Sequence, residues 1–245
     1  MSSSARLSHL DRAMGVYAMS PVNSLGLVLR SEPWEGHLTI SAGIFNGLER
    51  GSNFFRGYQP VGVSEGNKFE KMSYVARVDL APLDPLGKGE PDLEKAPSFR
   101  LGLGGSFLFN DGRSIRTMGA SGYLLAKWHG FHLVGETIWD KSEPRAQPTA
   151  TGNGTIAEDV TRLVAHGSLG YVILRNRLGV AARVEYLDGN SDIDDFDDQL
   201  VVAGTLSWYA VGHFLKVQAE YQHRRELHGV QVGNDAAIAG VQAAF

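Results

Sequence analysis

The chain has 245 residues, a formal net charge of −4 at pH 7, no cysteine and no run of 18 apolar residues. The lack of such a run excludes a transmembrane helix, and the acidic balance argues against nucleic acid as a partner. No Pro/Ser-rich linker divides the chain, so we expect one domain over residues 1–245, with residues 1–23 as an irregular lead-in.

The first thirty residues lack the continuous apolar core of a secretory signal peptide, because His9, Asp11, Arg12 and Ser20 interrupt it. Three interpretations stay open. The numbering starts after processing, or the chain is a piece of a longer protein, or the protein is not exported.

Strand-like segments follow one another along the rest of the chain. Most are about ten residues long, whereas strands of ordinary globular proteins are nearer five or six. Ten residues tilted by about 40–45° rise about 23–25 Å, which matches the apolar band of a bacterial outer membrane. The eleven predicted strands span residues 24–31, 36–46, 70–80, 98–110, 115–128, 131–140, 161–173, 177–188, 199–209, 213–223 and 235–245.

Residues 215–222 show the underlying pattern most clearly, because apolar and polar residues alternate there as LKVQAEYQ. A period of two is typical of a strand with one apolar and one polar face. The chain ends on the aromatic Phe245, as in a barrel that seals its last strand against its first. The sequence therefore predicts an all-β, antiparallel transmembrane β-barrel with about 11–12 strands in this chain.

The apolar faces of the predicted strands carry almost no charge, as lipid contact requires, because an Arg or Lys at the bilayer midplane would cost about 2–4 kcal/mol. A soluble β-sandwich would alternate in the same way with its polar face outside, so the period alone leaves that alternative open. The predicted outward residues include Leu25, Leu27, Leu29, Leu38, Ile40, Ala42, Ile44, Tyr74, Ala76, Val78, Leu80, Leu101, Leu103, Gly105, Phe107, Val180, Ala182, Val184, Tyr186, Leu215, Val217, Ala219 and Tyr221.

The connections between strands alternate between two lengths, as barrels of this type require. Short connections, predicted to be periplasmic turns, are residues 31–36, 129–130, 175–176 and 210–212. Long polar connections, predicted to face outside, are residues 47–69, 141–160, 189–198 and 224–234. Two connections break the alternation, since 81–97 is long on the side of the short turns and 111–114 is short on the side of the long loops.

Aromatic residues are predicted to form two girdles at the membrane interfaces. The periplasmic girdle comprises Trp128, Phe131, Tyr171, Trp208, Phe214 and Phe245. The outer girdle comprises Tyr74, Phe107, Phe109, Trp139, Tyr186 and Tyr221.

Four segments resemble a known family: GIFNG at 43–47, ARVEYLD at 182–188, LSWYAVGH at 206–213 and LKVQAEY at 215–221. Over about residues 10–245 the chain is similar to the phosphate-selective porin O and P family. The resemblance implies an outer-membrane barrel of sixteen strands, usually a trimer, that passes anions such as phosphate. It also implies that this chain corresponds to the C-terminal portion of such a barrel.

Charged side chains gather on the predicted lumen side. Basic residues in a narrow aqueous pore would attract anions and pass them between sites, whereas ion pairs with neighbouring acidic residues would only brace the wall. Both hypotheses stay open, and Arg183 and Lys216 are favoured for the pathway because the resemblance is strongest around them. The pore-lining candidates are Arg77, Arg100, Lys127, Arg183, Glu185, Lys216 and Glu220.

No metal, cofactor or catalytic site is predicted. The five aspartates of loop 189–198 are interpreted as a solvated acidic loop, with binding of a divalent ion as the alternative. His129 with His132, and His223 with His228, lack a third ligand at suggestive spacing and are interpreted as turn and rim histidines. No nucleophile and base stand out together, so the protein is predicted not to be an enzyme.

We therefore predict a porin of the bacterial outer membrane, with a water-filled channel for passive diffusion of small, phosphate-like anions. Its expected partners are outer-membrane lipid, lipopolysaccharide and these solutes, and the resemblance implies a homotrimer. The alternative is an outer-membrane barrel that acts as a receptor or adhesin through long loops such as 47–69 and 141–160.

Overall fold

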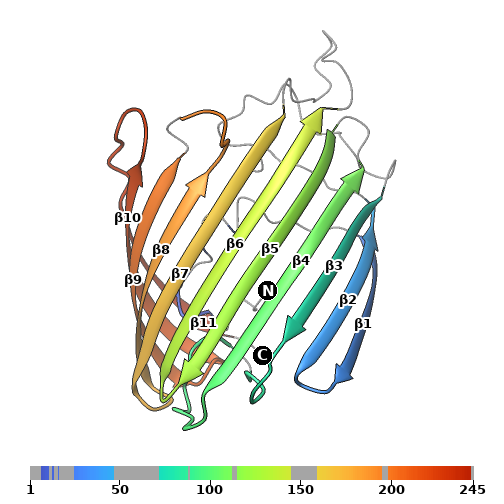
Figure 1. Cartoon of the computed structure of the whole chain (residues 1–245). Helices are drawn as coiled ribbons and strands as arrows, with labels where there is room; N and C mark the ends of the chain where they lie inside the picture. The colour runs from blue at the N-terminus through green and yellow to red at the C-terminus, as the bar shows by residue number, and fades with distance from the viewer. Residues whose placement is uncertain are drawn as a thin grey trace.

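The computed structural model describes residues 7–10, 13, 16, 25–46, 72–87, 89–111, 115–144, 159–194 and 198–243. These residues form one antiparallel sheet of eleven strands (Figure 1). The strands are β1 (Gly26–Trp34), β2 (Leu38–Phe45), β3 (Ser73–Leu80), β4 (Arg100–Asp111), β5 (Ile115–Trp128), β6 (Phe131–Pro144), β7 (Val160–Leu174), β8 (Leu178–Asp188), β9 (Gln199–Val211), β10 (Leu215–Glu226) and β11 (Ala236–Ala243).

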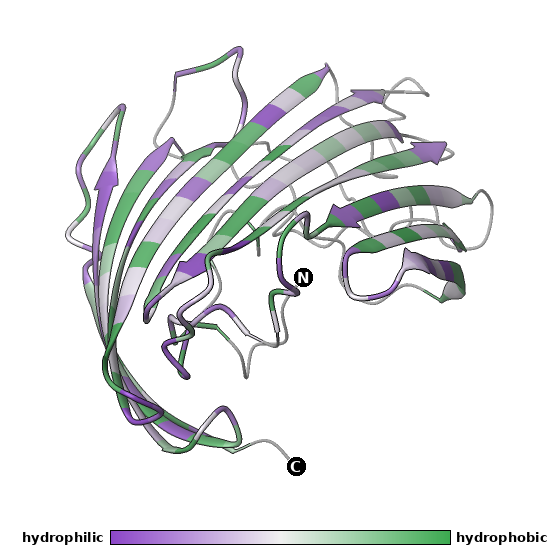
Figure 2. Ribbon diagram, turned by 60° about the horizontal axis from the view of Figure 1, so that its bottom comes forward, coloured by the Kyte–Doolittle hydropathy of each residue, from purple (hydrophilic) through white to green (hydrophobic). Residues whose placement is uncertain are grey.

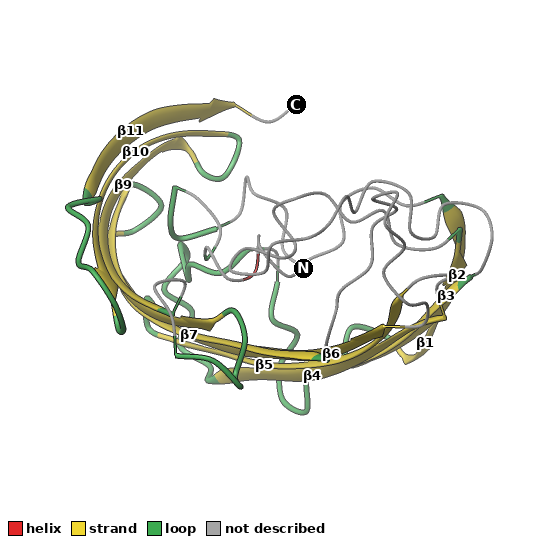
Figure 3. Cartoon of the chain, turned by 90° about the horizontal axis from the view of Figure 1, so that it is seen from above, coloured by secondary structure: helices red, strands yellow, loops and turns green. Residues whose placement is uncertain are grey.

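Each strand pairs with its neighbours in chain order, from β1 to β11. The sheet curves into an open arc, with β1 and β11 at its two ends (Figure 3). Within the described residues β11 does not pair with β1, so the predicted seal of the last strand against the first is not found there. The eleven strands cover only part of the circumference that their curvature defines (Figure 3).

All eleven predicted strands are confirmed, and the differences lie at their ends. β6 extends to Pro144 and β10 to Glu226, whereas the alternation predicted ends at residues 140 and 223. A strand continues wherever its backbone finds a ladder partner, even after its side chains become polar on both faces. On β6, for example, Lys141 and Glu143 form an ion pair of 3.0 Å beyond the predicted end.

The two faces of the sheet differ in polarity, as β8 and β10 show. On β10, Leu215, Val217 and Tyr221 are exposed on the convex face, whereas Lys216 and Glu220 are buried on the concave face. The cross-strand register continues this division, since Val217 lies opposite Trp208 and Val241. Figure 2 shows the resulting bands of apolar and polar residues across the arc. The predicted outward sets of β1, β2, β3, β4, β8 and β10 therefore share one face.

Short turns join the strands at one end of the sheet, as the predicted short connections require. Residues 129–130 form a two-residue hairpin between β5 and β6, with positive φ at both His129 (49°) and Gly130 (92°). Two positive φ angles are typical of a type I′ turn, whose twist matches the twist of the strands it joins. Asn176 has a φ of 58° in the turn between β7 and β8. The short connection 112–114 lies outside the described residues.

Aromatic side chains mark both ends of the convex face. Trp128, Phe131, Trp208 and Phe214 are exposed near the short turns, and Tyr74, Phe107, Trp139 and Tyr221 are exposed toward the other end. Phe245, which was predicted to close the first girdle, lies outside the described residues.

Two segments lie against the concave side of the arc. Residues 7–10, which belong to the predicted irregular lead-in, contact β7, β9 and β10, and residues 81–99 contact the wall from β4 to β9. The long connection 81–97, which broke the predicted alternation, is therefore explained by its fold into the arc. Among the described residues, no helix is long and apolar enough to cross a membrane.

Candidate functional site

The concave face of β7–β10 carries a group of buried polar side chains. Alternating positions on β10 place Lys216, Gln218, Glu220 and Gln222 side by side, and all four are buried. Buried polar groups are stable only when they find partners. The partners come from neighbouring strands and from residues 7–10.

An ion-pair cluster links β8 to β10. Arg183 Nε lies 2.6 Å from Glu185 Oε1, and Arg183 Nη2 lies 3.6 Å from Glu220 Oε1. The three side chains are almost entirely buried, so solvent screens their attraction little. A second pair, between Arg162 of β7 and Asp140 of β6, is also buried, with an Nε–Oδ1 distance of 2.9 Å.

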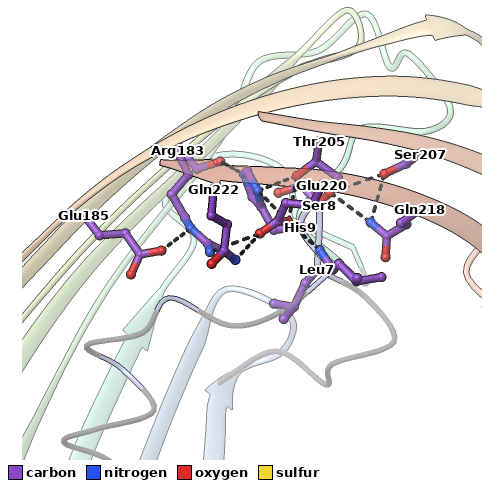
Figure 4. Close-up of polar contacts among 12 residues, drawn as sticks. Leu7, Ser8, His9, Arg183, Glu185, Thr205, Ser207, Gln218, Glu220 and Gln222 are labelled. Atoms are coloured by element: carbon purple, nitrogen blue, oxygen red, sulfur yellow. Dashed lines mark hydrogen bonds and ion pairs between the residues drawn. The ribbon is translucent and has the colours of Figure 1, made fainter. Parts of the chain in front are cut away.

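Residues 7–10 lie across the polar wall and receive hydrogen bonds from it (Figure 4). Lys216 Nζ donates to the Leu7 carbonyl at 2.8 Å, and Gln218 Nε2 donates to the Ser8 carbonyl at 3.1 Å. In the opposite direction, Leu10 N donates to Glu220 Oε2 at 2.8 Å. The backbone of this segment is thus bound by the wall as an adjacent strand would be, but through side chains.

His9 inserts its imidazole ring into the wall itself. His9 Nδ1 lies 2.7 Å from Thr205 Oγ1 and 3.3 Å from Glu220 Oε2, while His9 Nε2 lies 3.1 Å from Ser168 Oγ. The imidazole is buried, and these contacts engage both of its nitrogens. Residues 7–10 therefore narrow the concave space from the side of β7–β10.

Segment 81–99 narrows the same space near the short turns. Lys127 Nζ donates to the carbonyls of Leu86 and Gly89, the former at 3.0 Å. Asp92 pairs with Arg100 and accepts a hydrogen bond of 2.8 Å from Gly130 N. The side chain of Leu93 packs in a buried cluster on the wall together with Val172 and Tyr209. Charge pairing, backbone hydrogen bonds and apolar packing all hold this segment against the strands.

A third polar group lies on β3–β5. Arg77 forks onto Asp79 with distances of 2.7–3.0 Å, and Tyr123 OH donates to Asp79 Oδ1 at 2.7 Å. Gly104 makes this contact feasible, because a Cβ there would come within 2.1 Å of the Tyr123 ring. Beside Arg77, a cavity of about 230 Å³ opens between the wall and residues 86, 87, 89 and 90.

All seven predicted pore-lining residues belong to the concave face, but in three separate groups. Arg183, Glu185, Lys216 and Glu220 lie on β8 and β10, and Arg183 contacts both glutamates. The other two groups are Arg100 with Lys127, beside segment 81–99, and Arg77, beside Asp79. Their role as pore-lining residues stays a prediction.

The charged candidates differ in the partners that their side chains contact. Arg77, Arg100 and Arg183 form ion pairs, as wall bracing predicts. Lys127 and Lys216 instead donate to backbone carbonyls, and neither forms an ion pair among the described residues. Among the five basic candidates, the two lysines are therefore the ones whose hydrogen bonds within the described residues go to backbone carbonyls and not to carboxylates.

The sequence did not indicate that His9, Ser168 and Thr205 meet, or that Asp92 holds segment 81–99. The alternation does place Ser168 and Thr205 on the polar face, but His9 lies in a segment without periodicity. Its contact with Thr205 alone spans 196 positions, which no local pattern can indicate. Asp92 gave no signal beyond its charge.

His228, interpreted from the sequence as a rim histidine, lies in the loop after β10 beside two aspartates from the β8–β9 loop. Its ring faces Asp194 and Asp198, whereas His223 pairs separately with Asp235 at 2.9 Å. Sequence spacing could not show this cluster, because its members come from two loops. Asp195 and Asp197, also predicted in this acidic loop, lie outside the described residues, as do residues 47–71 and 145–158 of the loops on which the receptor alternative depends.

In comparisons with protein-family models, curated proteins and solved structures, nothing matched this chain. The resemblance to the porin O and P family therefore stays a prediction from the residues.

Proposed function

We propose that the chain forms the wall of a bacterial outer-membrane channel for passive diffusion of small solutes, with a preference for phosphate-like anions. The observation that carries this proposal is the inverted distribution of polarity. Large apolar side chains such as Leu206 and Val184 are exposed on the convex face, while charged side chains such as Lys216 are buried on the concave face.

This inversion is costly in water and favourable in a bilayer. A fully exposed Leu or Val side chain gains about 1.5–3 kcal/mol when it moves from water into an apolar medium, and a half-exposed one gains part of that. Leu206, Val184 and Val241 are each at least half exposed, and many other convex positions are similarly open to solvent. Lipid contact is the environment that offsets the cost of all of them together.

The concave side supports a polar channel rather than a dry core. Its charges are braced by partners, as in the cluster around Arg183, so the wall keeps its shape in contact with water. Residues 7–10 and 81–99 supply the constrictions that limit solute size. A wall of fixed charges with narrow points is how passive channels select solutes.

The preference for anions rests on Lys127 and Lys216. Their ammonium groups bond to carbonyl oxygens, which carry only partial charge, and neither lysine forms an ion pair among the described residues. The arginines contribute less, because Asp79, Asp92 and Glu185 neutralise them.

An open sheet is unstable in lipid, because the edge strands β1 and β11 would expose unpaired backbone N–H and C=O groups to hydrocarbon. We infer that further strands complete the barrel at these edges, consistent with a C-terminal portion of a sixteen-stranded wall. Association into a homotrimer follows only from the family resemblance and stays part of the proposal.

Current recordings on the protein extracted from outer membranes and reconstituted into planar bilayers test the proposal. A salt gradient should give stepwise currents with a reversal potential that favours anions. The double variant Lys127→Gln with Lys216→Gln should keep the channel and shift the reversal potential toward zero. Lys141→Gln is the control, because Lys141 pairs with Glu143 and Asp159 on the other face. Absence of channels would contradict the function, and an unshifted potential would contradict the anion assignment.

A further inference from the structure

Two loops lie beside each other at the end of the sheet opposite the short turns. Residues 189–198 connect β8 to β9, and residues 227–235 connect β10 to β11. β9 and β10 pair as far as Gln199 opposite Glu226, and Leu227 N then donates to the Asp198 carbonyl at 2.8 Å. This register brings His228 next to Asp198.

Three side chains from these loops converge on one point. His228 Nε2 lies 3.8 Å from Asp194 Oδ1 and 3.8 Å from Asp198 Oδ2, and the three atoms lie within 4.8 Å of one another. These distances are longer than hydrogen bonds to nitrogen, which end near about 3.2 Å, and they are ion pairs only when the imidazole is protonated. A point equidistant from atoms so spaced lies no more than about 2.5 Å from each, close to the about 2.0–2.2 Å of zinc–nitrogen and zinc–oxygen bonds.

The environment of the three atoms favours a cation. The Asp198 side chain is only 6% exposed, whereas the Asp194 and His228 side chains are open to solvent. The cluster is therefore buried on the Asp198 side and accessible to solvent on the other side. Asp188 and Asp192 belong to the same part of the chain and add negative potential that attracts cations.

The donor set also identifies the class of ion. Calcium and magnesium prefer oxygen ligands alone, whereas zinc accepts an imidazole nitrogen together with carboxylate oxygens. Three protein ligands leave the fourth tetrahedral position for water or for a group from outside.

We propose that Asp194, Asp198 and His228 form a zinc site that joins the β8–β9 loop to the β10–β11 loop. The site is independent of the channel function proposed above. It would fix the relative position of the two loops at one end of the wall.

Calorimetric titration of the full chain in detergent micelles with ZnCl₂ alone, after removal of metals by a chelator, tests the site. We expect saturable binding of about one zinc ion per chain. His228→Ala should weaken this binding at least about tenfold, since one of three ligands is lost. His228 is exposed, so its truncation should leave the strands folded, and the isosteric Asp198→Asn should have the same effect on zinc.

The matched control is His223→Ala, because His223 lies on the same hairpin but hydrogen-bonds to Asp235. That variant should bind zinc as the unchanged chain does. The proposal is overturned if the unchanged chain shows no saturable zinc binding, or if His228→Ala binds zinc equally well. Calcium binding that matches zinc binding and ignores His228 would also overturn it, since the acidic loop would then act alone.

Discussion

Lys216 Nζ donates a hydrogen bond of 2.8 Å to the carbonyl oxygen of Leu7, across 209 positions of the chain. Lys216 is fully buried on the concave face of β10, a strand in which exposed and buried residues alternate regularly. The bond shows that polar side chains on one face of a strand can bind a segment that has no strand partner of its own.

The cluster around Glu220 should contribute most to the binding of residues 7–10 to the concave face. In Glu220→Gln, the acceptor of Leu10 N and Thr205 Oγ1 loses its charge, and Arg183 loses one of its two carboxylates. We expect a loss of about 2–4 kcal/mol in the free energy of unfolding, measured by urea titration in micelles. A double-mutant cycle with Arg183→Met should show coupling, because the two residues share one network. Additive effects would contradict the ion-pair assignment.

Segment 81–99 should detach when Asp92 loses its charge. Asp92→Asn weakens the pair with Arg100 and the hydrogen bond from Gly130 N. We expect faster proteolytic cleavage within residues 81–99, with the strands still protected, as mapped by mass spectrometry of the fragments. Asp84→Asn is the matched control, because Asp84 is an exposed carboxylate on the same segment. Equal cleavage rates in both variants would mean that Asp92 does not hold the segment.

A charged side chain on the convex face should lower the folding stability strongly only if that face contacts lipid. Leu206 lies in the middle of β9 and is 50% exposed. In a bilayer, Leu206→Arg should cost about 2–4 kcal/mol of folding free energy. The same change on a water-exposed surface would stay within about 0.5 kcal/mol. Val230→Arg, in the exposed loop after β10, is the control and should be nearly neutral in either case. Unfolding in lipid vesicles distinguishes the two outcomes.

The β10–β11 hairpin should loosen in acid. Asp235 accepts hydrogen bonds from Tyr221 OH and Arg224 N and pairs with His223, and these contacts lower the pKa of its carboxyl group. A lowered pKa in the folded state means that the contribution to stability is present above the ordinary carboxyl pKa of about 4 and disappears as the pH falls through the folded value. The protection factors of the hairpin amides, which correct for the pH dependence of intrinsic exchange, should therefore fall in acid, and Asp235→Asn should remove that dependence on pH. An unchanged pH profile in the variant would contradict this assignment.

The strands were predictable because each carries its own signal. A period of two in β8, β9 and β10 is local, and it survives in the structure with the same residues on the same face. The seven site candidates followed from the same period, so their shared face was predictable and their separation into three groups was not. The curvature of the arc and the open edges at β1 and β11 depend on the whole sheet, which the pattern of single strands does not describe.

The long-range contacts had no local signal. His9 meets Thr205, and His228 meets Asp194, because the sheet brings distant segments together. Segment 81–99 was recognised only as an exception to the alternation of loop lengths. Its inward fold depends on Leu93 and Asp92, whose partners Tyr209 and Arg100 lie on different strands.

The central claim is that the concave face contacts water and the convex face contacts lipid. Since the chain has no cysteine, single cysteines can report on each position. Ala120 is exposed on the convex face, and its neighbour Ser121 is half-buried on the concave face. The measurement is the rate at which a membrane-impermeant maleimide labels Ala120→Cys and Ser121→Cys in isolated outer membranes. We expect rapid labelling at 121 and protection at 120, opposite to the order of their exposure in the isolated chain. Faster labelling at 120 would contradict the membrane channel and favour a soluble β protein.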